Sequence, residues 1–102
     1  MVVRKRRRST DVHGATFSPE VIDAVWSKGR IVPDRDPSVW RYDFCGLMIK
    51  RAEYGKTLSV HGWEIDHILP VSKGGTDELN NLQPLQWDNN RRKGDAYPWN
   101  CS

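Results

Sequence analysis

The chain has 102 residues, of which 37% are apolar, and its 16 Lys and Arg side chains outnumber its 13 acids to give a net charge of +3. This length suits one domain with a modest core. No apolar run is long enough for a membrane span or a signal peptide, so we expect a cytoplasmic protein without a membrane segment.

The positive charge is concentrated near the N-terminus, in the run RKRRR at residues 4–8. Removing these five cations from the net charge leaves −2 for the rest of the chain. A block of like charges repels itself, so we expect residues 1–15 to form a flexible basic arm. Such an arm can bind nucleic acid, with Arg6 and Arg7 as phosphate contacts, but a solubilising tail or a nuclear localisation signal would have the same composition.

The two cysteines, Cys45 and Cys101, are too few and too far apart for a zinc knuckle or a secreted disulfide framework. We therefore expect both thiols to be reduced.

In the first half of the chain, FSPEVIDAVWSKGR (residues 17–30) is typical of a short helix. Ser18 can cap this helix, Pro19 suits its first turn and Gly29 suits its exit. VPDRDPSVWRYD (residues 32–43) predicts a connecting loop. The short apolar run in FCGLMIKRAEYGK (residues 44–56) is compatible with either a strand or a helix.

The second half has clearer boundaries. GWEIDHI (residues 62–68) predicts a strand that Pro70 ends, and VSKGGTDELN (residues 71–80) predicts a polar loop. NLQPL (residues 81–85) predicts a second strand, at a sheet edge because of its proline. WDNNRRKG (residues 87–94) predicts a helix that ends at its glycine. The expected order is therefore strand, loop, strand, helix.

Within this order, His67 lies on the first strand, Asn81 opens the second, and Asn90 lies on the helix in the motif DNNRRK (residues 88–93). This pattern resembles the HNH endonucleases, in the variant whose last His is replaced by Asn. The resemblance implies an α+β fold with a ββα-metal finger at about residues 61–95. The finger would lie in a single domain of residues 16–102, with an added N-terminal helix and the basic arm.

Hydrolysis of a phosphodiester needs an activated water and a cation on the developing charge. A neutral imidazole can take a proton from water, so His67 is the candidate general base. Asp66 and Asn90 offer hard oxygen ligands for Mg²⁺ or Mn²⁺. By resemblance, Asn81 would pin the loop to the strand by hydrogen bonding and so orient the imidazole.

Adjacent residues of a regular strand point to opposite faces, so we expect the strand to end irregularly near His67. Glu64 shares the face of Asp66, where it either supports the metal site from behind the ligands or is simply solvated. Lys93 follows Asn90 by three positions and is the best candidate phosphate contact. Arg91 and Arg92 either contact phosphate too or are solvated cations at a helix C-terminus.

The sequence also departs from the family pattern. Many HNH proteins carry two Cys-x-x-Cys pairs for a structural zinc, and the second pair would fall here at Gln86 and Asn89. Of the first pair only Cys45 remains, with Met48 three positions later. We therefore do not expect a structural zinc, and we expect apolar packing in its place.

These observations predict a metal-dependent endonuclease that nicks or cleaves DNA. No recognition module is present, so sequence specificity would have to come from a protein partner or from a dimer. The alternative is a non-catalytic nucleic-acid-binding protein, in which the basic arm binds and the finger is only a scaffold.

Overall fold

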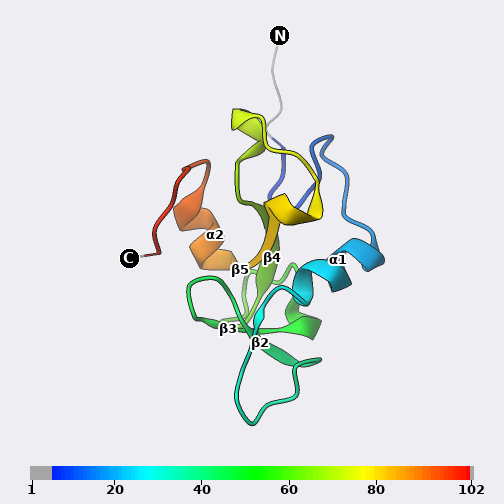
Figure 1. Cartoon of the computed structure of the whole chain (residues 1–102), viewed down its shortest axis with the longest axis vertical. Coiled ribbons are helices and arrows are strands. Elements are labelled where there is room, and N and C mark those ends of the chain that lie inside the picture. Colours follow the sequence, from blue (N-terminus) through cyan, green and yellow to red (C-terminus); the bar gives the residue numbers. More distant parts are fainter. Residues whose placement is uncertain (1–5, 102) are drawn as a thin grey trace.

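Two small antiparallel sheets organise the chain (Figure 1). The computed structural model describes residues 6–101. One sheet has the order β1-β2-β3, formed by β1 (Arg30–Ile31), β2 (Trp40–Tyr42) and β3 (Met48–Lys50). The other pairs β4 (Trp63–His67) with β5 (Leu82–Gln86), and α2 (Trp87–Lys93) follows β5 directly. The predicted order of strand, loop, strand and helix is therefore present in the second half.

Helix α1 (Pro19–Trp26) follows Ser18, whose hydroxyl accepts a hydrogen bond from the Val21 amide. Val25 and Trp26 are its buried residues, and the Trp26 ring lies 5.3 Å from the ring of Trp63 on β4. The helix thus brings its apolar side to the core that the two sheets share. That core is one cluster of buried apolar residues from α1 and the strands, together with Phe17: Phe17, Val25, Trp26, Ile49, Trp63, Ile65 and Leu82.

The short apolar run within residues 44–56, which the sequence left compatible with either a strand or a helix, forms strand β3. Ile49 is fully buried in the core, and its neighbours on the strand are half-buried. The predicted loop over residues 32–43 is correct only in its first part, since its last residues form β2. Arg41 on β2 pairs with Ile49 on β3. The two prolines of the loop lie before this strand and do not interrupt its ladder.

Three short 3₁₀ turns join the strands: η1 (Arg51–Glu53), η2 (Val71–Lys73) and η3 (Leu79–Asn81). The last two belong to the loop between β4 and β5. Among residues 6–101, no helix is long and apolar enough to cross a membrane.

The N-terminal segment of residues 6–16 lies against the second sheet, which differs from the expected flexible arm. The Ser9 hydroxyl accepts a hydrogen bond from the Ile65 amide at 2.9 Å and lies 2.8 Å from the Tyr54 hydroxyl. Thr10 is buried and forms an isolated bridge with Thr16. Of the basic run, Arg4 and Lys5 lie outside the described residues.

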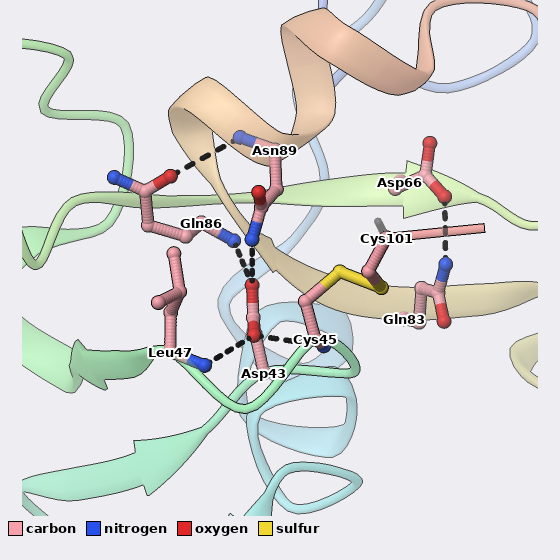
Figure 2. The surroundings of a disulfide bond; sticks show 8 residues. All are labelled: Asp43, Cys45, Leu47, Asp66, Gln83, Gln86, Asn89 and Cys101. Atoms are coloured by element: carbon pink, nitrogen blue, oxygen red, sulfur yellow. Dashed lines mark hydrogen bonds between the residues drawn. A yellow bond between two sulfur atoms is a disulfide. The ribbon is translucent and has the colours of Figure 1, made fainter. Parts of the chain in front are cut away.

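The cysteines form a disulfide between Cys45 and Cys101, so the expectation of reduced thiols was wrong (Figure 2). The two residues are 56 positions apart in the sequence, and their Cα atoms are 5.6 Å apart. Cys45 lies in the turn between β2 and β3, and Cys101 lies in the segment that follows α2. The pairing depends on how these two segments meet in space, which the spacing of two cysteines does not reveal.

Candidate active site

The candidate site is built by one face of β4 and the helix that follows β5. Side chains alternate along a strand, so Glu64 and Asp66 lie on the face opposite Trp63 and Ile65. Helix α2 presents Asn90 and Lys93 to them, because positions three apart share a helix face. Asn90 Nδ2 donates a hydrogen bond to Glu64 Oε1 at 3.0 Å, and Lys93 Nζ lies 3.2 Å from Asp66 Oδ1. Two carboxylates therefore face an amide and an ammonium group.

Each carboxylate oxygen of Asp66 has a polar partner. Its Oδ2 accepts a hydrogen bond from Gln83 Nε2 at 3.0 Å, across the register that pairs the two residues. Burial raises the pKa of the Asp66 carboxyl above its ordinary value, although the Gln83 hydrogen bond and the charge of Lys93 act in the opposite direction. An added cation that binds this carboxylate would favour its charged form.

Lys93 lies inside this cluster rather than on the surface. The residue is only 4% exposed, and its Nζ donates to the His67 carbonyl at 3.0 Å as well as contacting Asp66. The sequence reasoning placed Lys93 correctly on the face of Asn90, but that face turns toward β4. In this structure its ammonium group pairs with the buried Asp66 carboxylate and does not point to the surface, where a DNA phosphate would bind.

The imidazole of His67 lies on the other side of β4. Its Nε2 is 2.8 Å from Asp77 Oδ1, and its ring centroid is 6.0 Å from that of Phe17. Both Asp77 oxygens accept from the Val12 amide, each at 3.2 Å. The Phe17 ring packs near the imidazole, the N-terminal segment contacts its partner Asp77, and the His67 side chain is only 3% exposed.

Asp77 is the site residue that sequence reasoning missed. It lies within the polar loop TDELN, ten positions after His67, where the sequence offers several acids and gives no register. The weak signal that could have found it is the combination of an isolated strand histidine with acids in the loop that returns to the neighbouring strand. A histidine that acts as a base or ligand commonly has a carboxylate on its second nitrogen.

Strand β4 keeps its ladder with β5 through the pair of His67 with Leu82 and then ends. Asp66 and His67 accordingly project to opposite sides, as the strand geometry requires. Lys93 connects the two positions, since it contacts the Asp66 carboxylate and the His67 carbonyl. The irregular strand end that we expected near His67 begins only after His67, where the pairing with β5 stops.

Asn81 fixes the loop that follows His67. Its Oδ1 accepts from the Leu69 amide at 2.8 Å, and its Nδ2 donates to the carbonyls of Leu69 and Thr76 at 3.1 and 2.9 Å. Gly75 permits this close packing, because a Cβ at that position would lie 1.7 Å from the Leu69 carbonyl oxygen. The predicted pinning of the loop to the strand by this amide therefore has a direct counterpart in these hydrogen bonds.

The donor chemistry suits a hard divalent cation. Asn90 Nδ2 is engaged by Glu64, so Oδ1 is the atom of that amide which can bind a metal. Together with the Asp66 carboxylate it would offer two oxygen donors, and Mg²⁺ sites often have few protein ligands because the ion keeps several waters. Within the described part of the chain, no group of three or more His, Cys, Asp or Glu side chains is placed to hold a metal ion.

The remaining predicted contacts lie at the surface. Arg91 and Arg92 are exposed, and the Arg91 guanidinium lies over the Trp87 ring at 4.8 Å. Arg7 is also exposed, whereas Arg6 turns back on its own segment and donates to the Thr10 carbonyl at 2.6 Å. The structure therefore brings Glu64, Asp66, Asn90 and Lys93 together on one side of β4. It places the His67 imidazole with Asp77 on the other side and the Asn81 side chain in the loop that follows, and it leaves the arginines outside these groups.

The family described as HNH endonuclease matches residues 44–99, which is more than half of the chain and includes β4, β5 and α2. The chain belongs to the HNH endonuclease family. It has no significant match among curated proteins or among solved structures. Membership in the HNH family indicates nuclease activity on a nucleic acid and the use of a divalent metal ion.

Gln86 and Asn89, where many HNH proteins carry the second cysteine pair, both donate here to the buried carboxylate of Asp43 (Figure 2). Asp43 Oδ2 accepts from the Gln86 amide at 2.9 Å and from Asn89 Nδ2 at 3.1 Å. Its Oδ1 accepts from the amides of Cys45 and Leu47, both at 2.9 Å. This one side chain therefore connects the β2–β3 turn with the first turn of α2, next to the disulfide.

Proposed function

We propose that this HNH protein hydrolyses phosphodiester bonds of DNA, and that it nicks or cleaves with one divalent metal ion. The observation that carries the proposal is the Asp77–His67 pair at the end of the strand that also holds Asp66. A carboxylate that accepts from Nε2–H fixes the tautomer in which Nδ1 carries the lone pair. Nδ1 of His67 is then the atom that takes the proton from the attacking water.

Asp66 and Asn90 would hold the ion, with Mg²⁺ or Mn²⁺ favoured by their hard oxygen donors. When bound, the ion would supply positive charge to the phosphate and the leaving oxygen. Glu64 supports this site by orienting the Asn90 amide through the hydrogen bond from Nδ2. Lys93 keeps Asp66 compensated through their 3.2 Å contact, and Asn81 fixes the loop next to His67.

The exposed cations beside the site supply phosphate contacts. Arg91 and Arg92 extend from the last turn of α2, and Arg7 is exposed on the segment that contacts β4. Arg6 is half-buried and would have to leave the Thr10 carbonyl to contact phosphate. Contacts of this kind position a duplex without reading its sequence. Specificity would therefore depend on a protein partner or on a dimer.

One observation favours a second candidate function, the non-catalytic binding of nucleic acid. The His67 side chain is 3% exposed, and Lys93 already occupies the Asp66 carboxylate. If the N-terminal segment and Lys93 never release these groups, the finger serves as a scaffold and only the exposed cations contact the nucleic acid.

The deciding experiment is a supercoiled-plasmid assay with the wild type, His67→Ala and, as a matched control, His13→Ala, which replaces an exposed histidine. Each protein is incubated with Mg²⁺, with Mn²⁺ and with EDTA. We expect nicked or linear plasmid with the wild type and His13→Ala in metal, and intact plasmid with His67→Ala or EDTA. Gel shifts by all three proteins without cleavage under any condition would favour the binding function.

A further inference from the structure

The sheet β1-β2-β3 gathers three cations over two aromatic rings on one face. The Arg30 guanidinium lies 5.5 Å from the centroid of the Tyr42 ring. Arg35 and Lys50 both lie over the Trp40 ring, at 5.5 and 5.4 Å. The strand register places Trp40 opposite Lys50 and Tyr42 opposite Arg30, so these side chains share a face. We call this set of five residues the basic aromatic face.

This face is the outer one. Arg41 lies between Trp40 and Tyr42 on β2 and pairs with Ile49, the neighbour of Lys50 on β3, and Ile49 is fully buried in the core. Arg30 and Arg35 are exposed, and Lys50, Trp40 and Tyr42 are half-buried. In Figure 1 the sheet lies in the lower half of the molecule, and the loop that follows β4 lies in the upper half. The basic aromatic face is thus distinct from the candidate active site.

None of the three cations forms an ion pair with a carboxylate of the described residues, 6–101. Among residues 6–101, the ion pairs join Arg51 with Asp23, Lys56 with Glu53, His67 with Asp77, and Lys93 with Asp66. Asp34 and Asp36 share the loop of Arg35, but neither forms an ion pair there, and Asp36 accepts from the Ser38 amide and hydroxyl instead. Within the described part of the chain, the three cations of the face are therefore not engaged in ion pairs.

The rings hold the cations without using their hydrogen-bond donors. A guanidinium above an aromatic ring keeps its N–H groups free to donate, and the stacking limits the orientations of a long side chain. Two cations already lie over the Trp40 ring, which leaves little of that ring for a stacked base. The arrangement suits phosphate oxygens better than nucleobases.

We propose that the basic aromatic face binds the phosphate backbone of duplex DNA at a distance from the cleaved bond. The proposal rests on the proposed function in one respect, that DNA is the substrate. The basic aromatic face would hold the flanking duplex while the end of β4 acts on one phosphodiester. It would add affinity that does not depend on the DNA sequence.

The test measures binding and not cleavage. Anisotropy of a labelled duplex is followed in EDTA over a series of salt concentrations, for the wild type and for Arg30→Gln/Arg35→Gln/Lys50→Gln. Each phosphate contact contributes about 0.9 to the slope of log affinity against log salt. We expect the triple variant to bind more weakly, with a slope reduced by about 2 to 3. Near-UV circular dichroism establishes that the variant is folded.

A matched pair separates a local contact from a general loss of charge. Lys50→Gln and Lys56→Gln make the same change, but Lys56 lies in an exposed turn beside Glu53. We expect Lys50→Gln to reduce both affinity and slope, and Lys56→Gln to leave the slope unchanged. Equal effects of the two, or an unchanged slope in the triple variant, would overturn the proposal.

The two proposals fail in different ways. If the wild type cleaves plasmid and the triple variant keeps the wild-type slope, the nuclease function holds and the basic aromatic face does not bind DNA. If the wild type never cleaves but the triple variant loses slope and affinity, the face binds DNA and the catalytic proposal is the one that fails.

Discussion

At the scale of single residues, the site depends on side chains that act through their neighbours. Asp77 illustrates this, because it contacts Nε2 of His67 and no group of the expected metal site. Asp77→Asn keeps the shape of the side chain but removes the carboxylate that orients the imidazole. We expect the cleavage rate at saturating DNA to fall about 10- to 100-fold, with unchanged DNA affinity in EDTA. Glu78→Gln makes the same charge change at an exposed neighbour and should cleave normally.

Loss of DNA affinity in Asp77→Asn, with a normal rate at saturation, would show instead that Asp77 shapes the binding surface. A normal rate and a normal affinity together would remove Asp77 from the site altogether.

Lys93 is the second residue whose role follows from burial. Lys93→Met would leave the buried Asp66 carboxylate without its nearest cation. Breaking one partner of a buried pair costs about 3–5 kcal/mol, so we expect the free energy of unfolding to fall by about this amount. Urea titration of Lys93→Met and of Arg92→Met, which changes an exposed neighbour, measures the difference. Equal stabilities of the two variants would contradict this assignment.

At the scale of elements, the sequence was informative where local patterns decide the structure. Alternation in WEIDH and the proline and glycine boundaries predicted β4, β5 and α2, and hence the elements that carry Asp66, His67 and Asn90. The strands β2 and β3 were less predictable, because each has three residues and their register depends on burying Ile49. Asp77 and Asp43 could not be found, since their partners come from segments with no fixed sequence spacing.

Asp43 joins two elements by hydrogen bonds that no sequence pattern indicated. It is 1% exposed and accepts four hydrogen bonds, from the β2–β3 turn and from the start of α2. In Asp43→Asn, one of the two accepting oxygens becomes an NH₂ group, which cannot accept hydrogen bonds. The two N–H donors that it faces lose their partner, and each unsatisfied buried donor costs about 1–3 kcal/mol. We therefore expect a loss of about 2–4 kcal/mol in the free energy of unfolding, measured by urea titration.

Asp36→Asn is the control for this prediction, because Asp36 accepts similar hydrogen bonds from Ser38 at an exposed position. Solvent can replace those bonds, so its loss should stay within about 0.5 kcal/mol. If Asp43→Asn is no more destabilising than Asp36→Asn, the buried carboxylate does not hold the two elements together.

At the scale of the whole molecule, stability and access to the site depend on the N-terminal and C-terminal segments, which both pack against the ββα finger. The N-terminal segment, which lies outside the region that matches the HNH family, contacts β4 through Ser9 and the β4–β5 loop through Val12. The C-terminal segment returns to the β2–β3 turn through the Cys45–Cys101 disulfide. Both contacts join residues far apart in the chain, which explains why composition and local pattern indicated a free arm and free thiols.

The disulfide gives the last prediction. It closes a loop of 56 positions, and the loop-entropy relation gives a stabilisation of about 4 kcal/mol for a loop of this length. We expect dithiothreitol to lower the guanidinium midpoint of the wild type and to leave that of Cys45→Ser/Cys101→Ser unchanged, so that the two proteins coincide under reducing conditions. The Asp43 hydrogen bonds remain without the disulfide, so the reduced protein should still fold and bind DNA. An unchanged midpoint in wild type whose two thiols are shown to be free would mean that the hydrogen bonds of Asp43 alone hold the β2–β3 turn against α2.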